Sequence, residues 1–82
     1  MSTDIRLHDS VALLQDTHTS HFDNGRPLVL RRGQVGTVVM VYDGDTYEVE
    51  FATRDGRAYA ILPLSGDTLM ILRDSPEFAA SQ

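Results

Sequence analysis

The sequence predicts an all-β fold built from five short strands. Two Asp-Gly dipeptides, at 43–44 and 55–56, each separate two runs rich in apolar and β-branched residues. Asp-Gly supplies the positive φ angles that tight hairpin turns need, and alternation of apolar with polar residues is typical of strands with one buried face. The stretch "LRRGQVGTVVMVYDGDTYEVEF", residues 30–51, is the most ordered part of this pattern. We therefore expect the central hairpin to carry most of the core.

The N-terminal third of the chain predicts one strand and one long loop. Apolar residues at 5, 7, 11 and 13 have period two, with a polar break at 8–10, which indicates a first strand at about 10–15. The next stretch, "DTHTSHFDNGRP" at 16–27, contains Asn-Gly and a proline and has no sustained period. Such a composition is typical of a loop. We expect this loop to be mobile and dispensable for folding, with a little structure at 28–30.

The central hairpin is predicted to have one apolar and one mixed face. Residues 35–42 are rich in β-branched residues, and residues 47–52 alternate strictly. A turn of two or of four residues gives the same faces, because the two registers differ by an even step. The uniformly apolar face is the expected core face: Val38, Met40, Tyr42, Tyr47, Val49 and Phe51. The other face is expected to be at least partly solvated: Thr37, Val39, Val41, Thr46, Glu48 and Glu50.

The second Asp-Gly pair predicts another strand and sets its register. A two-residue turn places Ala52 opposite Tyr59, and Glu50 opposite Ile61. Pro63 is then expected at a sheet edge or strand end, because it cannot donate a ladder hydrogen bond. Further residues join the core face: Ala60, Leu62 and Leu64. The residues expected to dominate the core are Val38, Met40, Val49, Phe51 and Leu62.

The C-terminal part predicts a short last strand and a tail. Residues 69–72 are apolar and follow an "SGD" turn. Ser75, Pro76 and Glu77 can start one helical turn, and the alternative is a frayed tail.

Five short strands with a long loop after the first match the plan of a small SH3-like barrel. In such a barrel a bent sheet closes or half-closes over one core, and Gly36 is expected to let two backbones approach at a corner. The 82 residues suit one domain, 1–82, with a core at about 8–72 and a tail at 73–82.

Composition narrows the classes of function. Twelve acidic residues face seven arginines and no lysine, a net charge of −5. This balance opposes binding to nucleic acid and to anionic membranes, and it suits a basic protein partner. A modest acidic charge can also serve only to keep a small protein soluble. The lack of cysteine excludes thiolate chemistry and disulfides and suits a reducing interior. With no membrane span or signal peptide expected, the sequence favours a cytoplasmic protein, and its small size argues against an enzyme.

Several segments resemble a family of small bacterial proteins of unknown function. The segments are "HDSVALLQD", "LRRGQVGTVVMVY", "YEVEF", "DGRAYAILPL" and "LMIL", and together they cover roughly residues 8–72. The matched positions are Asp9, Val11, Leu13, Arg32, Gly33, Gly36, Thr37, Val38, Val39, Tyr47, Val49, Glu50, Phe51, Asp55 and Gly56. The resemblance implies an SH3-like barrel with some likeness to KOW domains and to the β-subunit barrel of nitrile hydratase. It implies no established activity, and the 16–27 loop is about eight residues longer than the pattern.

Two clusters of polar residues invite a chemical interpretation. His18, His21 and Asp23 offer metal-ligand side chains, but they lie in the expected loop without an evident fourth ligand, so an exposed polar loop is the alternative. Glu48 and Glu50 share one strand face, where a solvated surface is expected rather than acid–base chemistry, because no nucleophile is near them. The triplet His8-Asp9-Ser10 is triad-like only in composition. We predict no catalytic residue, no metal and no cofactor.

Four arginines leave an RNA-binding alternative open. Arg31 and Arg32 precede the Gly-rich corner, and Arg54 and Arg57 flank the second turn. KOW-type barrels use such loops on RNA. Asp55 dilutes the patch and the sequence shows no aromatic platform for stacking, so nucleic acid is not the expected ligand.

The function predicted from the sequence is that of a non-catalytic protein-interaction module, an accessory, assembly or antitoxin-like partner of a neighbouring gene's product. The expected partner surface is an apolar strip with acidic edges: Val39, Val41, Glu48, Glu50, Tyr59 and Ile61. A self-complementary strip can also make a homodimer. The alternative is that the long loop, Ile5 and Leu7, or the tail with Phe78 cover the strip within one chain.

Overall fold

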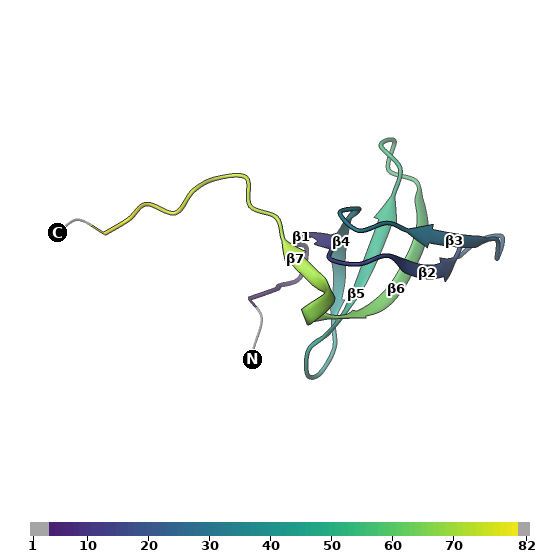
Figure 1. Cartoon of the computed structure of the whole chain (residues 1–82), viewed down its shortest axis with the longest axis horizontal. Coiled ribbons are helices and arrows are strands. Elements are labelled where there is room, and N and C mark those ends of the chain that lie inside the picture. The colour runs from purple at the N-terminus through teal and green to yellow at the C-terminus, as the bar shows by residue number, and fades with distance from the viewer. Residues whose placement is uncertain (1–3, 81–82) are drawn as a thin grey trace.

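The computed structural model describes residues 4–80, and within that range the protein is all-β apart from one 3₁₀ turn. The strands and the turn are β1 (Ser10–Leu13), β2 (Thr17–Ser20), β3 (Pro27–Leu30), β4 (Val35–Val41), β5 (Thr46–Ala52), β6 (Ala58–Ser65), η1 (Gly66–Thr68) and β7 (Leu69–Ile71). Five of the strands form one antiparallel sheet in the order β6-β5-β4-β1-β7, and β2 and β3 form a separate hairpin. Figure 1 shows this hairpin crossing the strands of the larger sheet. β6 and β7 are the edges of the larger sheet, so the sheet is not closed.

The prediction of a loop throughout 16–27 is wrong, because four of its residues, Thr17–Ser20, form a strand that pairs with β3. β2 and β3 are in register from Thr17 opposite Leu30 to Ser20 opposite Pro27. β2 contains no apolar residue, and its sequence, "THTS", gives no strand signal. β3 carries the burial: Leu30 is buried in the core and Leu28 packs against it. The hairpin therefore closes one side of the core.

The core lies between the larger sheet and this hairpin. It gathers buried side chains from β1, β3, β4, β5, β6 and β7 together with one residue that precedes β1: Ile5, Val11, Leu13, Leu30, Val38, Tyr47, Val49, Phe51, Ala60 and Leu69. Leu62 and Leu64 are partly buried against it, as expected for the core face of β6. Gly36 has the predicted close approach: a Cβ there would lie 2.7 Å from Val49 Cγ1 and 2.9 Å from the Glu50 carbonyl oxygen.

Met40 and Tyr42 do not join the core, contrary to the prediction. The turn between β4 and β5 has three residues, because the Tyr42 amide donates to the Thr46 carbonyl oxygen at 2.9 Å. This register differs by an odd step from the two that alternation suggested, so Met40 lies opposite Glu48 and Val41 opposite Tyr47. A bulge between Val38 and Met40 then restores the expected parity, and Val38 lies opposite Val49. Met40 is consequently 49% exposed.

The second hairpin also combines a three-residue turn with a bulge. Its turn is closed by the Thr53 amide donating to the Arg57 carbonyl oxygen at 2.9 Å, so Ala52 lies opposite Ala58 and not opposite Tyr59. A bulge at Tyr59 again restores the register, and Glu50 lies opposite Ile61 as predicted. The Tyr59 side chain packs against the core.

The chain ends in an extended tail. Residues 72–80 are exposed and contain no helix, so the tail alternative for Ser75–Glu77 holds within the described residues. Figure 1 shows the tail leaving the sheet at β7 and running away from it.

Candidate functional site

The side of the larger sheet that faces away from the core is the best candidate for a binding surface. Thr37, Glu50 and Ile61 lie opposite one another on β4, β5 and β6, and Met40, Glu48 and Pro63 form the next row on the same face. We call these six residues the outer face. Met40, Ile61 and Pro63 are exposed and the two glutamates are half-buried between them. β4, β5 and β6 contain no lysine or arginine, so this apolar surface is acidic.

One end of the outer face is more acidic than the rest. The β4–β5 turn contributes Asp43 and Asp45, and the Gly66 amide donates to the Asp45 carbonyl oxygen at 2.8 Å, which brings η1 with Asp67 beside the turn. The Tyr42 hydroxyl donates to Glu48 Oε1 at 2.6 Å. This hydrogen bond, together with partial burial and the negative charge of Glu48, raises the pKa of the Tyr42 phenol above its ordinary value.

Only half of the strip predicted from the sequence lies on the outer face. Glu48, Glu50 and Ile61 share it. Val41 lies opposite Tyr47, whose ring is in the core, so it belongs to the other face, and Val39 occupies the bulge. Tyr59 packs against the core and its hydroxyl accepts a hydrogen bond from Gln34 Nε2.

Met40 and Pro63 are the residues of the outer face that sequence reasoning missed. Met40 was assigned to the core by strict alternation, which a bulge interrupts. Pro63 is in edge strand β6, as the prediction of a sheet edge or strand end allowed, and it lies opposite Glu48. The predicted strip did not include it.

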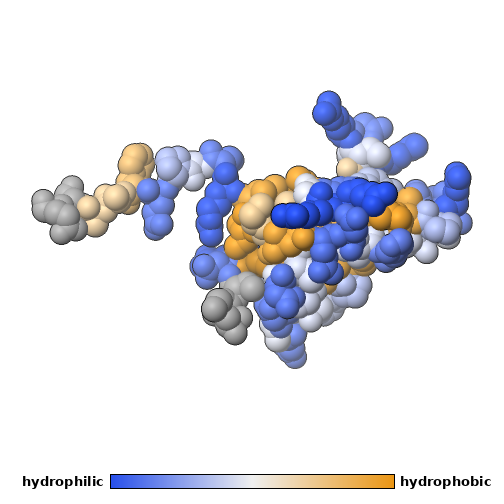
Figure 2. Space-filling model, viewed as in Figure 1, coloured by the Kyte–Doolittle hydropathy of each residue, from blue (hydrophilic) through white to orange (hydrophobic). Residues whose placement is uncertain are grey.

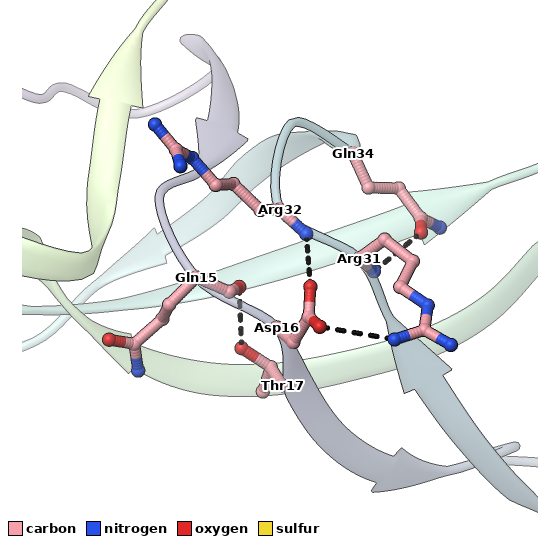
Figure 3. Close-up of polar contacts among 6 residues, drawn as sticks. All are labelled: Gln15, Asp16, Thr17, Arg31, Arg32 and Gln34. Carbon is pink, nitrogen blue, oxygen red and sulfur yellow. Dashed lines mark hydrogen bonds and ion pairs between the residues drawn. The ribbon is translucent and has the colours of Figure 1, made fainter.

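Asp16 holds the turn between β3 and β4 (Figure 3). Its carboxylate accepts a hydrogen bond from the Arg32 amide at 2.8 Å and forms an ion pair with Arg31 Nη1 at 3.1 Å. The Arg32 amide, followed by the Arg31 guanidinium, lowers the pKa of Asp16 below its ordinary value. Arg31 is therefore already paired, whereas Figure 3 shows the Arg32 guanidinium pointing away from Asp16.

Two of the three residues considered as metal ligands, His21 and Asp23, lie in the β2–β3 turn. His21 Nδ1 accepts a hydrogen bond from the Asp23 amide at 3.1 Å, and its ring stacks on Phe22 with centroids 5.6 Å apart. His18 lies in β2 opposite Val29. Among residues 4–80, no three His, Asp or Glu side chains are grouped closely enough to hold a metal ion.

An aromatic surface lies beside Arg57 of the second turn. His21 and Phe22 line the same depression as Gly56 and Arg57, and Phe22 is 56% exposed. In this turn the Thr53 hydroxyl, followed by the Arg57 amide, lowers the pKa of Asp55. The sequence did not suggest this platform, because Phe22 lies in a segment that was expected to be a mobile loop.

The triad-like triplet forms a backbone turn. His8 has a positive φ of 73°, and its amide donates to the Val38 carbonyl oxygen at 2.8 Å. Asp9 Oδ2 accepts a hydrogen bond from the Arg6 amide at 2.9 Å. These contacts give the triplet a role in ending the β1–β4 ladder.

Comparison with protein families gives one match. The model of the family described as "Domain of unknown function (DUF4926)" matches residues 7–71, most of the chain. The chain belongs to this family. The DUF4926 match begins before β1 and ends at the last residue of β7, so it includes the outer face and leaves out the C-terminal tail. No curated protein and no solved structure matches the chain. No helix among residues 4–80 is long and apolar enough to cross a membrane.

Proposed function

We propose that this DUF4926 chain is a non-catalytic module that binds a basic protein through its outer face. The observation that carries the proposal is the pair of half-buried glutamates, Glu48 and Glu50, set among the exposed Met40, Ile61 and Pro63 with no cation on the three strands. Exposed apolar side chains provide contact area, and the carboxylates select a partner of opposite charge and speed its association. In this proposal the chain acts as an accessory, assembly or antitoxin-like subunit, and its partner is the product of a neighbouring gene.

The proposal includes the fold relationship. A five-stranded antiparallel sheet with a hairpin folded over its core is the plan expected of an SH3-like barrel, related to KOW domains and to the nitrile hydratase β-subunit barrel. In this arrangement the outer face is the solvent side of the bent sheet. A convex surface of this kind suits docking to another protein better than enclosing a small substrate.

A capture experiment tests the proposed function. The full chain is immobilised and exposed to nuclease-treated lysate of its source, alongside two variants with the same change in net charge. Glu48→Arg/Glu50→Arg reverses the charges on the outer face, and Asp4→Arg/Asp74→Arg reverses two exposed charges elsewhere. We expect the wild type and the Asp4/Asp74 variant to retain a basic protein that the Glu48/Glu50 variant loses. Equal capture by both variants contradicts the proposal.

A second candidate function is RNA binding by the β2–β3 and β5–β6 turns. The stacked His21 and Phe22 rings beside Arg57 supply the aromatic platform and the cation that single-stranded RNA binding needs. The net charge of −5 argues against it. We expect no complex with mixed RNA in a gel shift at about 150 mM salt. A complex that Phe22→Ala and Arg54→Ala/Arg57→Ala abolish would favour this function over the first.

A further inference from the structure

A second exposed apolar surface lies on the opposite half of the same sheet. Val35, Ala12 and Met70 lie opposite one another on β4, β1 and β7. Leu72 follows Met70 by two residues. It lines one depression with Val35 and with polar residues at its rim: His8, Asp9, Ser10, Arg73 and Asp74. We call the exposed Val35, Met70 and Leu72, together with the buried Ala12 that lies between Val35 and Met70, the tail-base patch. Figure 2 shows hydrophobic surface at the base of the C-terminal tail. Val35 is 51% and Met70 49% exposed.

The tail that leaves from this patch carries an unburied aromatic side chain. Phe78 is 93% exposed, more than any other large apolar side chain among residues 4–80. It lies six positions after Leu72, a reach of about 20 Å in extended form. The tail continues the direction of β7, away from Met70 and Ala12, so reaching its own patch requires the chain to reverse direction. A second copy related by a two-fold axis receives the same tail without a reversal.

The charge next to Phe78 is opposite to a charge near the tail-base patch. Glu77 directly precedes Phe78, and Arg32 lies three residues before Val35 in the β3–β4 turn. Arg32 forms no ion pair with another described residue, in contrast to Arg31, which is paired with Asp16. A Phe78 side chain seated on Val35 and Met70 brings the Glu77 carboxylate within reach of the Arg32 guanidinium.

We infer that two copies of this chain form a dimer by exchanging their C-terminal tails, each Phe78 covering the tail-base patch of the other copy. Two-fold symmetry buries both aromatic side chains and forms both Glu77–Arg32 pairs at once. This inference does not rest on the proposed function. The tail-base patch lies on β4, β1 and β7, and the outer face lies on β4, β5 and β6, so both copies keep their outer faces free.

Sedimentation equilibrium of the full chain over a range of concentrations tests the dimer. We expect a reversible dimer, with Phe78→Ala raising its dissociation constant by about a hundredfold, because two side chains are lost and each contributes at least about tenfold. Phe22→Ala removes another exposed aromatic side chain, far along the chain from the patch, and should leave the dissociation constant unchanged. Both variants should keep the wild-type circular dichroism spectrum, since neither side chain is in the core.

A charge exchange separates tail docking from other modes of dimerisation. Arg32→Glu alone and Glu77→Arg alone should each weaken the dimer, and the double variant should restore it. A wild-type chain that stays monomeric at about 1 mM overturns the inference. If Phe78→Ala then shifts the Met70 methyl resonance of this monomer, the tail docks within its own chain. A dimer that is insensitive to Phe78→Ala overturns it as well. Because the Glu48/Glu50 variant leaves the tail intact, failure of the dimer and failure of partner capture are observed separately.

Discussion

Phe51 is the largest fully buried side chain of the protein, and it gives the most direct test of the core. Truncation to alanine removes its contacts and leaves a cavity, which costs about 3–5 kcal/mol of unfolding free energy. In a chain of 82 residues this loss is comparable to the total stability. We expect Phe51→Ala to abolish cooperative urea unfolding.

Met40→Ala is the matched control, because alternation places Met40 on the same face as Phe51 and the structure leaves it half exposed. Its unfolding free energy should fall by no more than about 0.5 kcal/mol. An effect of Met40→Ala as large as that of Phe51→Ala would mean that the bulge at Val39 is absent.

Tyr42 reports the register of the first hairpin through its pKa. The hydrogen bond to Glu48 raises the pKa of the phenol above 10.0, so this interaction stabilises the fold below that pH and is lost as the pH rises through the raised value. Glu48→Gln should lower the pKa of Tyr42, followed by the near-ultraviolet absorbance of tyrosinate. Glu50→Gln, which changes the neighbouring glutamate, should leave it unchanged. Equal shifts in the two variants would contradict the Tyr42–Glu48 pairing.

At the scale of elements, the β2–β3 hairpin makes the strongest prediction. Replacing residues 16–27 by a short Gly/Ser linker removes β2 and leaves β3 without a partner, so Leu30 loses its support over the core. We expect loss of the cooperative thermal transition, measured by circular dichroism. As a control, removal of residues 73–80 deletes a shorter segment and should preserve the transition, because that segment is wholly exposed. A cooperative transition after the linker replacement would restore the original expectation of a dispensable loop.

The elements that sequence reasoning predicted well are those whose apolar pattern has only one solution. The core positions predicted correctly include Val38, Val49 and Phe51. The bulges at Val39 and Tyr59 restore the predicted parity at these positions. β2 was missed because "THTS" has no apolar residue and is held by pairing with β3 rather than by its own burial. Met40 and Tyr42 were misplaced because a turn of three residues and a bulge each shift the parity, and neither leaves a mark in the alternation. The partner strip predicted from the sequence contains the same error, because its members were chosen by the same parity.

For the whole molecule, two carboxylates make stability depend on pH. The pKa of Asp16 is lowered by the Arg32 amide and then by Arg31, and that of Asp55 by the Thr53 hydroxyl and then by the Arg57 amide. Because the folded state holds these groups ionised, their contribution is complete above the ordinary value of 3.8 and is lost as the pH falls through the lower folded values.

Thermal melts between about pH 7 and pH 2 measure this contribution. The midpoint of the wild type should fall once the pH drops below about 4. Asp16→Asn/Asp55→Asn should have a lower midpoint at neutral pH and a shallower fall in acid. Asp4→Asn/Asp74→Asn, with the same change in charge, should follow the wild-type curve. Parallel curves for all three proteins would show that acid acts through net charge alone.

The two bulges have a consequence for changes in chain length. β4 and β6 each contain one residue more than the stretch of β5 they pair with, Val39 and Tyr59, while β5 has no surplus. If Val39 is deleted, every other β4–β5 pair can still form, with Met40 facing outward and Val38 facing the core. Only the extra bend that the bulge adds to the strand is lost. Loss of the Val49 codon instead shifts half of β5 against both neighbours. We expect the Val39 deletion to remain folded and the Val49 deletion to unfold, measured by backbone amide exchange, because Val39 is a surplus residue outside the core whereas Val49 is buried in it.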